Sequence, residues 1–488
     1  MAIKRYAANA DNTISNAFQE SLNVRATGSN MGQADVSEIY SIYGRQSTSS
    51  SELSRVLSSF DIDSISSDRT AGIIPASGSV SFFVCLYNAE TTKTVPKNFT
   101  IVAQAISRSW NEGDGLDLEN YKDLGVSNWI SASKGIPWTT QGGDYHTSPE
   151  YQQTFKTGLE DLKLDISELV EQWIAGTKVN YGIGFRLTAS NEAKSDTNTG
   201  GAEKSYYTKR FFARGTQYFF KKPVIEARWN SSTQDDRGDF YYSSSLAPAS
   251  DNLNTIYLYN FVRGRLTNIP VIGTGSIFVS LYSGSSAPEG NKLVLHDGNT
   301  NVTGGHVSTG IYSCSIAITS AATPLRTLFD VWHNDTVTEY FTGSIKPEKH
   351  YALAASTGNT RYVTNIRNLR SKYFSEEEAR FNVYVRNKNW SPTIYTVASK
   401  DIENTIIPSA SYRVYRVFDG YNVIPHGTGS ELHTLLSYDV SGNYFNLDMS
   451  LLEPGYEYGI KLAFYDSQRQ SWIEQDQKFV FRVEDYEY

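Results

Sequence analysis

Short apolar runs separated by glycine, serine, asparagine and aspartate dominate this chain. In several of these runs apolar and polar residues alternate with a period of two, as in the segment 412–417 (YRVYRV). Such alternation, rich in β-branched and aromatic residues, predicts strands with one buried face. The clearest predicted strands are residues 80–87, 99–106, 181–187, 275–282 and 412–418. Many short strands with turn residues between them indicate β-sandwiches, so we expect an all-β fold.

One segment has the period of a helix instead. Its apolar positions fall on a single stripe and are Leu169, Val170, Trp173 and Ile174. Residues 165–168 (DISE) have the spacing of a capping box, and Gly176 is a typical C-terminal stop. We therefore expect one helix here, with a return to a strand at residues 179–183.

The length of 488 residues suggests roughly three domains, at about 150 residues each. Residues 229–252 are polar and rich in turn formers, and residues 367–380 are charged and interrupt the strand pattern. Both compositions are typical of linkers. We therefore predict domains at 1–228, 235–370 and 375–488.

The last two predicted domains share a spacing of apolar residue, proline and tyrosine at offsets zero, two and six. It occurs in residues 345–351, ending at Tyr351, and in residues 452–458, ending at Tyr458. This spacing resembles the tyrosine corner of fibronectin type III and related immunoglobulin-like sandwiches. The resemblance implies that each tyrosine hydroxyl bonds back to the backbone across a turn. Coincidence in a chain with 33 tyrosines is the alternative.

Residues 1–228 resemble the DNRLRE-type β-sandwich, a jelly-roll-like module. The segments that carry the resemblance are residues 8–14, 53–62, 109–113 and 162–182. The resemblance implies a jelly roll with the predicted helix lying across one end. This chain departs from the pattern in residues 25–50, which are long and polar, and in residues 113–145, which exceed what the family turn needs.

Residues 110–121 (WNEGDGLDLENY), followed by Ser127 and Trp129, resemble virion proteins of large tailed marine phages. The chain starts at Met1, and Lys4 and Arg5 are not followed by an apolar stretch, so no secretory signal is expected. The resemblance implies a non-enzymatic structural protein in the virion, at the tail, baseplate, neck or capsid as decoration. Its partners would be other virion proteins, or further copies of itself in a homo-oligomer.

A carbohydrate-binding, host-recognition adhesin is the alternative, with a host surface glycan as partner. It requires an exposed aromatic platform, and the candidates for glycan or partner contact are Trp110, Trp129, Trp138 and Tyr145. The competing interpretation is that these tryptophans fill a sandwich core. Which of the two holds stays open at this point.

The formal net charge of −8 and the pI near 5.5 argue against a nucleic-acid partner, which would need a basic face. No run approaches the roughly 18 apolar residues of a membrane span, so no membrane is expected either. The two cysteines, Cys85 and Cys314, lie far apart and predict no disulfide framework.

One loop could carry chemistry, because it holds five carboxylates: Glu112, Asp114, Asp117, Glu119 and Asp123. Their oxygens could wrap a Ca²⁺ ion, with Asp114, Asp117 and Glu119 as candidates, although the spacing is not that of an EF-hand. A solvated acidic loop is the simpler interpretation, so we predict no metal and no cofactor. Paired carboxylates also admit a glycosidase, but no pair is singled out. No nucleophile elbow, phosphate loop or dinucleotide motif occurs, so we predict no catalytic residues.

Overall fold

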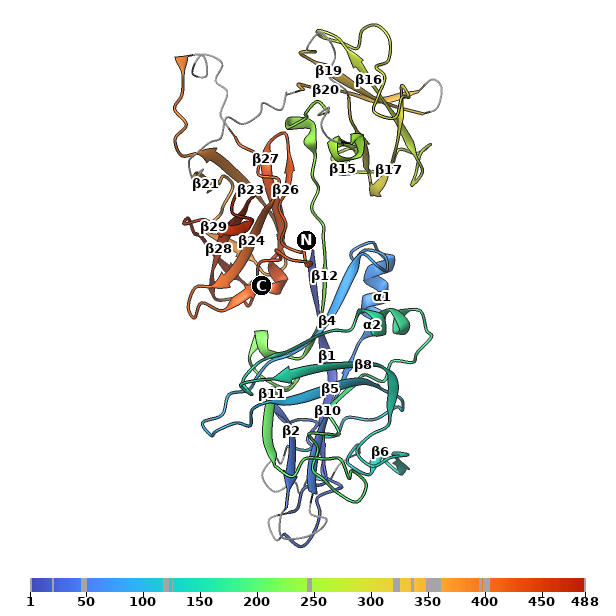
Figure 1. Ribbon diagram of the computed structural model, residues 1–488, viewed down its shortest axis with the longest axis vertical. Helices are drawn as coiled ribbons and strands as arrows, with labels where there is room; N and C mark the ends of the chain where they lie inside the picture. The colour runs from blue at the N-terminus through green and yellow to red at the C-terminus, as the bar shows by residue number, and fades with distance from the viewer. Residues whose placement is uncertain are drawn as a thin grey trace. The chain divides into compact units, whose positions relative to one another are not determined.

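The computed structural model describes residues 2–19, 22–44, 51–116, 123–124, 126–243, 248–318, 325–334, 338–347, 361–394, 397 and 404–486. The described part is all-β with two α-helices, which confirms the predicted fold class (Figure 1). The chain forms two compact units, residues 2–230 and 231–488, and the division falls inside the polar segment 229–252. Among the described residues, no helix is long and apolar enough to cross a membrane.

A ten-stranded antiparallel sheet builds the first unit. In hydrogen-bonding order its strands are β8 (Tyr145–Phe155), β5 (Phe99–Ile106), β10 (Ile183–Leu187), β3 (Ser51–Phe60), β1 (Ile3–Ser15), β12 (Val224–Trp229), β4 (Val80–Leu86) and β9 (Leu162–Asp165). Two further strands, β2 (Val36–Tyr43) and β11 (Tyr206–Phe212), pair with each other, and β2 also pairs with β3. The predicted strand at 99–106 is β5, and the one at 80–87 is β4 with one residue fewer.

Strand β1 is shared between the two layers of this unit. Its first part, from Ile3 to Ala7, pairs with β12, whereas the part from Ala8 onward pairs with β3 after a shift of register. Side chains from both parts of the sheet, among them Val84 of β4 and Ile101 of β5, meet in one buried core. The sheet therefore folds over on itself as a jelly-roll-like sandwich.

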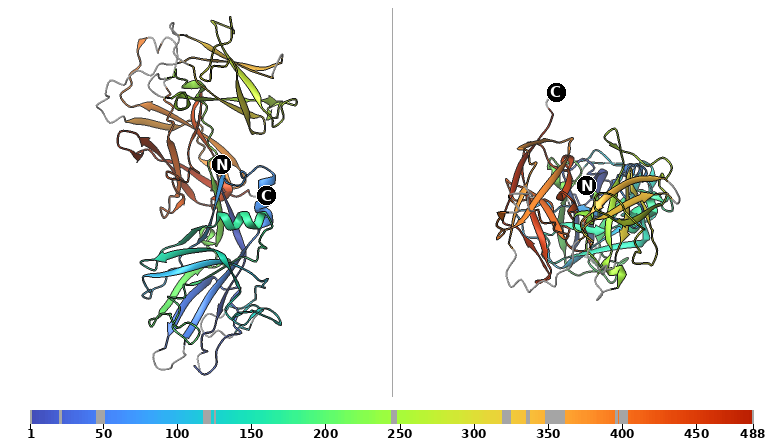
Figure 2. Two further views of the ribbon diagram at one scale, coloured as in Figure 1. Left: turned by 45° about the vertical axis from the view of Figure 1, so that its right-hand side comes forward. Right: turned by 90° about the horizontal axis from the view of Figure 1, so that it is seen from above.

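Two helices lie side by side at this unit, α1 (Ile62–Thr70) and α2 (Ser167–Ile174) (Figures 1 and 2). The guanidinium of Arg69 in α1 donates to both carboxylate oxygens of Glu171 in α2, at 2.7 and 2.6 Å. The expectation of a single helix was wrong. Sequence inspection missed α1 because only Ile62 and Ile65 of its nine residues are buried apolar side chains, too few for a stripe.

Helix α2 has the predicted apolar stripe, with Leu169, Val170 and Trp173 buried. The predicted capping box was wrong, because Asp165 is the last residue of β9 and Ile166 occupies the N-cap. Asp165 Oδ1 accepts instead from the backbone N–H of Ser167, at 3.0 Å. Gly176 has a φ of +69°, as a C-terminal stop should.

The connection between β5 and β8 covers the outer face of the sheet. Alternation along β3 sends Val56 into the main core, while Leu57 joins a second buried cluster with Ile14 and Ile106. Within this connection β6 (Ser131–Ser133) and β7 (Ile136–Pro137) form a small hairpin. Residues 126–145 of this connection thus cover a sheet face that would otherwise be exposed.

The second unit contains two sandwiches. The first has the strands β13 (Asn254–Tyr259), β18 (Ile311–Ile316), β17 (Val302–Ser308), β16 (Ile277–Ser283), β19 (Leu328–His333) and β20 (Glu339–Ile345), plus the hairpin β14 (Phe261–Val262) and β15 (Arg265–Leu266). Strand β17 pairs with β16 at its start and with β18 at its end, so it connects two sheets. Tyr312 and Trp332 are fully buried in the core between these strands.

The last sandwich packs two sheets. One has β21 (Tyr362–Ile366), β23 (Glu378–Asn387), β27 (Gly442–Asp448) and β26 (Ser437–Asp439), and the other has β22 (Lys372–Phe374), β30 (Phe479–Glu484), β28 (Glu457–Asp466), β24 (Ala410–Arg416), β25 (Asn422–Ile424) and β29 (Ser471–Glu474). Stacked rings fill the core, including Tyr412 on Phe445 at 4.1 Å between centroids. Because β21 belongs to this sandwich, residues 362–366 were wrongly placed in the middle domain.

One predicted tyrosine corner is present. Tyr458 is fully buried, and its hydroxyl donates to the carbonyl of Glu453 at 2.7 Å, across the turn that precedes β28. This bond confirms the prediction for residues 452–458. Tyr351, the counterpart in the other sandwich, lies outside the described residues.

Candidate functional site

The four aromatic residues predicted to contact a glycan or partner gather in one place, but they do not form an exposed platform. Trp129 and Trp138 are only 4% and 5% exposed and belong to the second buried cluster of the first unit. Trp110 and Tyr145 are partly buried and pack against the same cluster. The expectation of a stacking platform was therefore wrong for Trp129 and Trp138, because the covering connection buries its own aromatic rings against the sheet.

Hydrogen bonds fix these rings. The indole nitrogen of Trp110 donates to the carbonyl of Tyr181 at 2.8 Å, and that of Trp138 donates to the carbonyl of Asn128 at 2.8 Å. Each buried indole N–H thus has the partner that burial requires. The tryptophans tie the covering connection to strand ends and to its own backbone.

The acidic loop is joined to the same region through Glu112. Its carboxylate accepts from the guanidinium of Arg214, at 3.1 and 2.6 Å, and from the backbone N–H of Asp11 at 2.7 Å. Asp114 is exposed, while Asp117 and Glu119 lie outside the described residues. Among the described residues, no three His, Cys, Asp or Glu side chains come together as a metal site. For the part of the loop that includes Asp117 and Glu119, the expectation of no bound metal therefore stays a prediction.

Asp11, beside Glu112, is nearly buried, and its carboxylate accepts from the backbone N–H of Arg214 at 2.5 Å. The pKa of Asp11 is raised to about 7, mainly by burial; the neighbouring Glu112 charge contributes to the rise, and Arg214 opposes it. Sequence inspection gave no sign of this group, because Asp11 and Arg214 are 203 residues apart.

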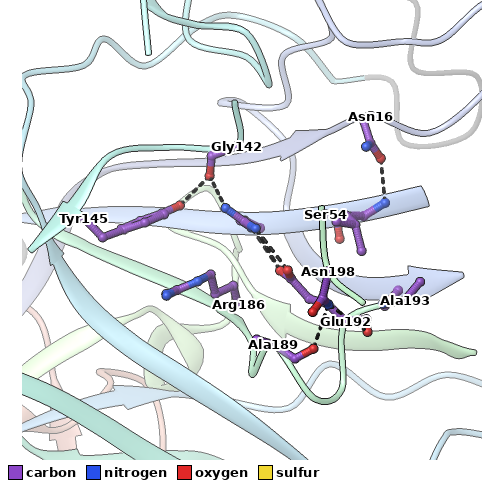
Figure 3. Close-up of polar contacts among 12 residues, drawn as sticks. Asn16, Ser54, Gly142, Tyr145, Arg186, Ala189, Glu192, Ala193 and Asn198 are labelled. Atoms are coloured by element: carbon purple, nitrogen blue, oxygen red, sulfur yellow. Dashed lines mark hydrogen bonds and ion pairs between the residues drawn. The ribbon is translucent and has the colours of Figure 1, made fainter. Parts of the chain in front are cut away.

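Sequence inspection also missed a polar cluster that includes Gly142, Tyr145 and Glu192 (Figure 3). Arg55 of β3 bonds to two of these residues. Its guanidinium donates to both carboxylate oxygens of Glu192 at 3.1 Å, and to the carbonyl of Gly142 at 2.9 Å. The Gly142 carbonyl also accepts from the hydroxyl of Tyr145 at 2.7 Å. Arg55 and Glu192 are 13% and 12% exposed, so this pair is largely withdrawn from water.

A second guanidinium, that of Arg186, also lies close to Tyr145. The guanidinium carbon of Arg186 is 4.8 Å from the centre of the Tyr145 ring, and both of its terminal nitrogens donate to Gln104 Oε1, at 2.8 and 2.7 Å. Burial raises the pKa of Tyr145, and the charges of Arg55 and Arg186 only partly oppose the effect. The phenol therefore stays neutral and acts as a hydrogen-bond donor.

A glycine makes room for this arrangement. A Cβ on Gly184 of β10 would lie 2.1 Å from a ring carbon of Tyr145, so only glycine lets the ring rest on the strand. Sequence signals for the cluster were weak. They were an arginine among the apolar residues of each of two strands, Arg55 in β3 and Arg186 in β10, and the glycine Gly184 in β10. The cluster clamps the covering connection onto the sheet.

In the second unit a short segment bonds to both sandwiches, and we refer to residues 233–237 as the joint. On one side, the carbonyl of Thr233 accepts from the backbone N–H of Tyr438 at 2.9 Å, and Asp235 N–H donates to the Tyr438 carbonyl at 3.0 Å. These bonds add the joint to the edge strand β26 of the last sandwich. They come from the stretch that composition alone predicts to be a loose linker.

Asp236 links the joint to both sandwiches at once. One carboxylate oxygen accepts from the hydroxyl of Tyr438 in β26 at 2.7 Å, and the other accepts from the backbone N–H of Thr255 in β13 at 2.6 Å. Burial is the main reason that the pKa of Asp236 is raised. One side chain thus bridges two separately folded sheets.

Arg237 fixes the joint to the middle sandwich. Its guanidinium pairs with both oxygens of Asp330, each at 2.6 Å, and Asp330 also accepts from the indole nitrogen of Trp332 at 2.7 Å. Arg237 begins the tripeptide Arg-Gly-Asp, a cell-adhesion motif when exposed. Here the Arg237 side chain is 13% exposed and paired with a fully buried carboxylate, so it has a structural function.

Comparisons with known proteins add little to this picture. No protein-family model matches the chain, and no curated protein matches it. Among solved structures, one titled "Crystal structure of DIP-gamma IG1+IG2" matches 44% of this chain and 86% of that chain, at 10% sequence identity and a TM-score of 0.12. A score this low carries no argument about function.

Proposed function

We propose that this chain is a non-enzymatic structural protein of a bacteriophage virion, an accessory component of the tail, baseplate, neck or capsid that docks onto other virion proteins. The observation that carries the proposal is the joint. A carboxylate shared between two sandwiches, at Asp236, suits a protein that must hold its modules together inside an assembly. A flexible tether would leave this segment solvated and without bonds to either module.

The ion pairs of the buried carboxylates support the same proposal. The nearly buried carboxylates of Glu192, Glu226 and Asp330 are paired with arginines of their own unit, so their charges hold strands and connections together. Arginine forms such two-pronged pairs because its planar guanidinium matches a carboxylate. We infer that these groups act in folding, and that contacts with partners come from exposed loops and sheet edges.

A glycan-binding function lacks comparable support. It needs aromatic faces open to a sugar, and Trp129 and Trp138 are buried under their own connection. We therefore do not propose the adhesin alternative.

Sedimentation of particles tests the proposal. Particles purified on a density gradient and washed in high salt should retain this chain at a constant ratio to the major capsid protein. A soluble host enzyme, followed on the same gradient, should stay at the top. Recovery of the chain only in the soluble fractions would contradict a place in the virion.

A variant pair sharpens the test. Tyr438→Phe removes the hydroxyl that reaches Asp236, whereas Tyr465→Phe alters an exposed tyrosine of the same sandwich. If the joint matters to assembly, Tyr438→Phe should be incorporated less well than Tyr465→Phe when each competes with the wild-type chain. Equal incorporation would show that the joint contributes nothing to docking.

A further inference from the structure

The first unit buries a lysine directly against an asparagine amide. Lys209, in β11, is only 2% exposed. Its ammonium nitrogen lies 2.6 Å from Oδ1 of Asn88, the second residue after the end of β4, although 121 positions separate the two in sequence. Among the residues that the structure describes, no carboxylate forms an ion pair with Lys209. Such burial of an unpaired lysine is unusual, because desolvation of an ammonium is costly.

The backbone fixes the two residues side by side. Asn88 forms an isolated bridge with Phe211, and bonds from Ala89 N–H to the Arg210 carbonyl at 3.1 Å and from Phe212 N–H to the Tyr87 carbonyl at 2.9 Å flank it. The Asn88 N–H donates to the carboxylate of Asp161 at 2.7 Å. Neither residue can move far from the other while the unit stays folded.

The rest of the site is apolar or carbonyl in character. The Lys209 nitrogen lies 4.9 Å from the ring centre of Phe155 and 4.7 Å from that of Phe211, and both rings are fully buried. Its other acceptors are the carbonyls of Gly158 at 3.1 Å and Glu160 at 2.8 Å. The nearby Glu160 carboxylate is turned into its own loop, where it accepts from the backbone N–H groups of Thr157 and Gly158.

We propose that Lys209 and Asn88 form an intramolecular isopeptide bond, which covalently links β11 to the segment after β4. The lysine nitrogen is hydrogen-bonded to Oδ1 and is therefore already next to Cγ, the carbon that an amine would attack. Attack forms the Nζ–Cγ bond and breaks the bond from Cγ to the amide nitrogen. That nitrogen leaves as ammonia, taking up the proton that the lysine amine gives up, so the step needs no oxidant and no further reactant.

The surroundings favour the reactive form of the amine. Burial is the main reason that the pKa of Lys209 falls to about 8, with the charges of Asp161 and Glu160 opposing it. At neutral pH roughly a tenth of the molecules then carry an uncharged amine, far more than for a lysine in water. The carboxylate of Asp161, which accepts from the backbone N–H of Asn88, lies close enough for its charge to act on Lys209.

Intact-mass measurement of the denatured full-length chain tests this inference. The wild-type chain, incubated at about pH 9, where about nine-tenths of the Lys209 amines are uncharged, should weigh one ammonia less than its sequence. Tryptic digestion should give a branched peptide that contains both Lys209 and Asn88. A wild-type chain at its full sequence mass would overturn the inference, as would an ammonia loss confined to one linear peptide.

Three variants identify the atoms involved. Asn88→Asp should lose water instead of ammonia, because a carboxyl group then supplies the leaving oxygen. Lys209→Arg should keep its full sequence mass, whereas Lys194→Arg, which alters an exposed lysine paired with Glu203, should show the same ammonia loss as wild type. An ammonia loss that persists in Lys209→Arg would assign the chemistry to another site and overturn the inference. Should Lys209→Arg fail to fold, the wild-type and Asn88→Asp masses still decide.

Discussion

Replacing Asp330 by asparagine tests how firmly the joint is attached to the middle sandwich. Asp330 is fully buried and balances the charge of Arg237 through two bonds of 2.6 Å. An asparagine keeps the size of the side chain and an acceptor for Trp332, but it cannot balance the guanidinium. Removing one partner of a buried ion pair costs about 3–5 kcal/mol, because it leaves the other charge unpaired. We expect the free energy of unfolding of this unit to fall by that amount.

Urea denaturation measures the decrease in the free energy of unfolding, and trypsin digestion reports whether the joint has become accessible. In the wild-type chain Arg237 is held in the joint, so cleavage after Arg237 should be slow; in Asp330→Asn it should become fast. The control is Lys372→Gln in the same unit, since Lys372 is 63% exposed and its pair with Glu484 should contribute less than about 1 kcal/mol. A loss below about 1 kcal/mol for Asp330→Asn, with Arg237 still protected, would refute this reasoning about the buried pair.

Three further predictions concern single contacts. Glu226 is paired with Arg5 and Arg228, and although burial alone would raise its pKa, the two arginines lower it to about 2 from 4.5. Since the pKa of Glu226 is lower in the folded than in the unfolded chain, its ion pairs stabilise the fold by about 3 kcal/mol above pH 4.5, and this stabilisation is lost as the pH falls towards 2. The stability of Glu226→Gln should lack this loss in acid. An unchanged acid-denaturation profile would contradict a stabilising function of the Glu226 pairs. Gly184→Ala should destabilise the first unit in thermal melts by forcing Tyr145 off the strand, whereas Gly200→Ala, with open space around it, should not; equal melting of the two variants would argue against the close contact. Tyr458→Phe should cost about 1 kcal/mol in urea denaturation by leaving the Glu453 carbonyl without its donor, and a neutral result would show that the tyrosine corner does not contribute to stability.

The local pattern of apolar residues predicted several strands correctly. Residues 99–106 form β5 as predicted because their aromatic and β-branched residues suit a strand that is buried on both faces. Helix α1 escaped notice because two isoleucines, Ile62 and Ile65, suffice to dock it once α2 covers its side. Tertiary packing, which the local sequence does not reveal, decides such short helices.

The polar sites could not be predicted for a different reason. Arg55 and Glu192 are 137 residues apart, and Arg237 and Asp330 are 93 apart, so nothing in the local sequence joins them. The tryptophans of the covering connection were identified, but whether they face solvent depends on which side of the sheet that connection crosses. Burial of Trp129 on the outer face decides that point in favour of a structural role.

Immunogold labelling of intact, purified phage particles tests the central proposal most directly. Antibody raised against the full-length chain should label particles at a constant position, and labelling should disappear when the antibody is first adsorbed with the purified chain. Labelling restricted to lysed host cells, with particles unlabelled, would contradict a structural function in the virion.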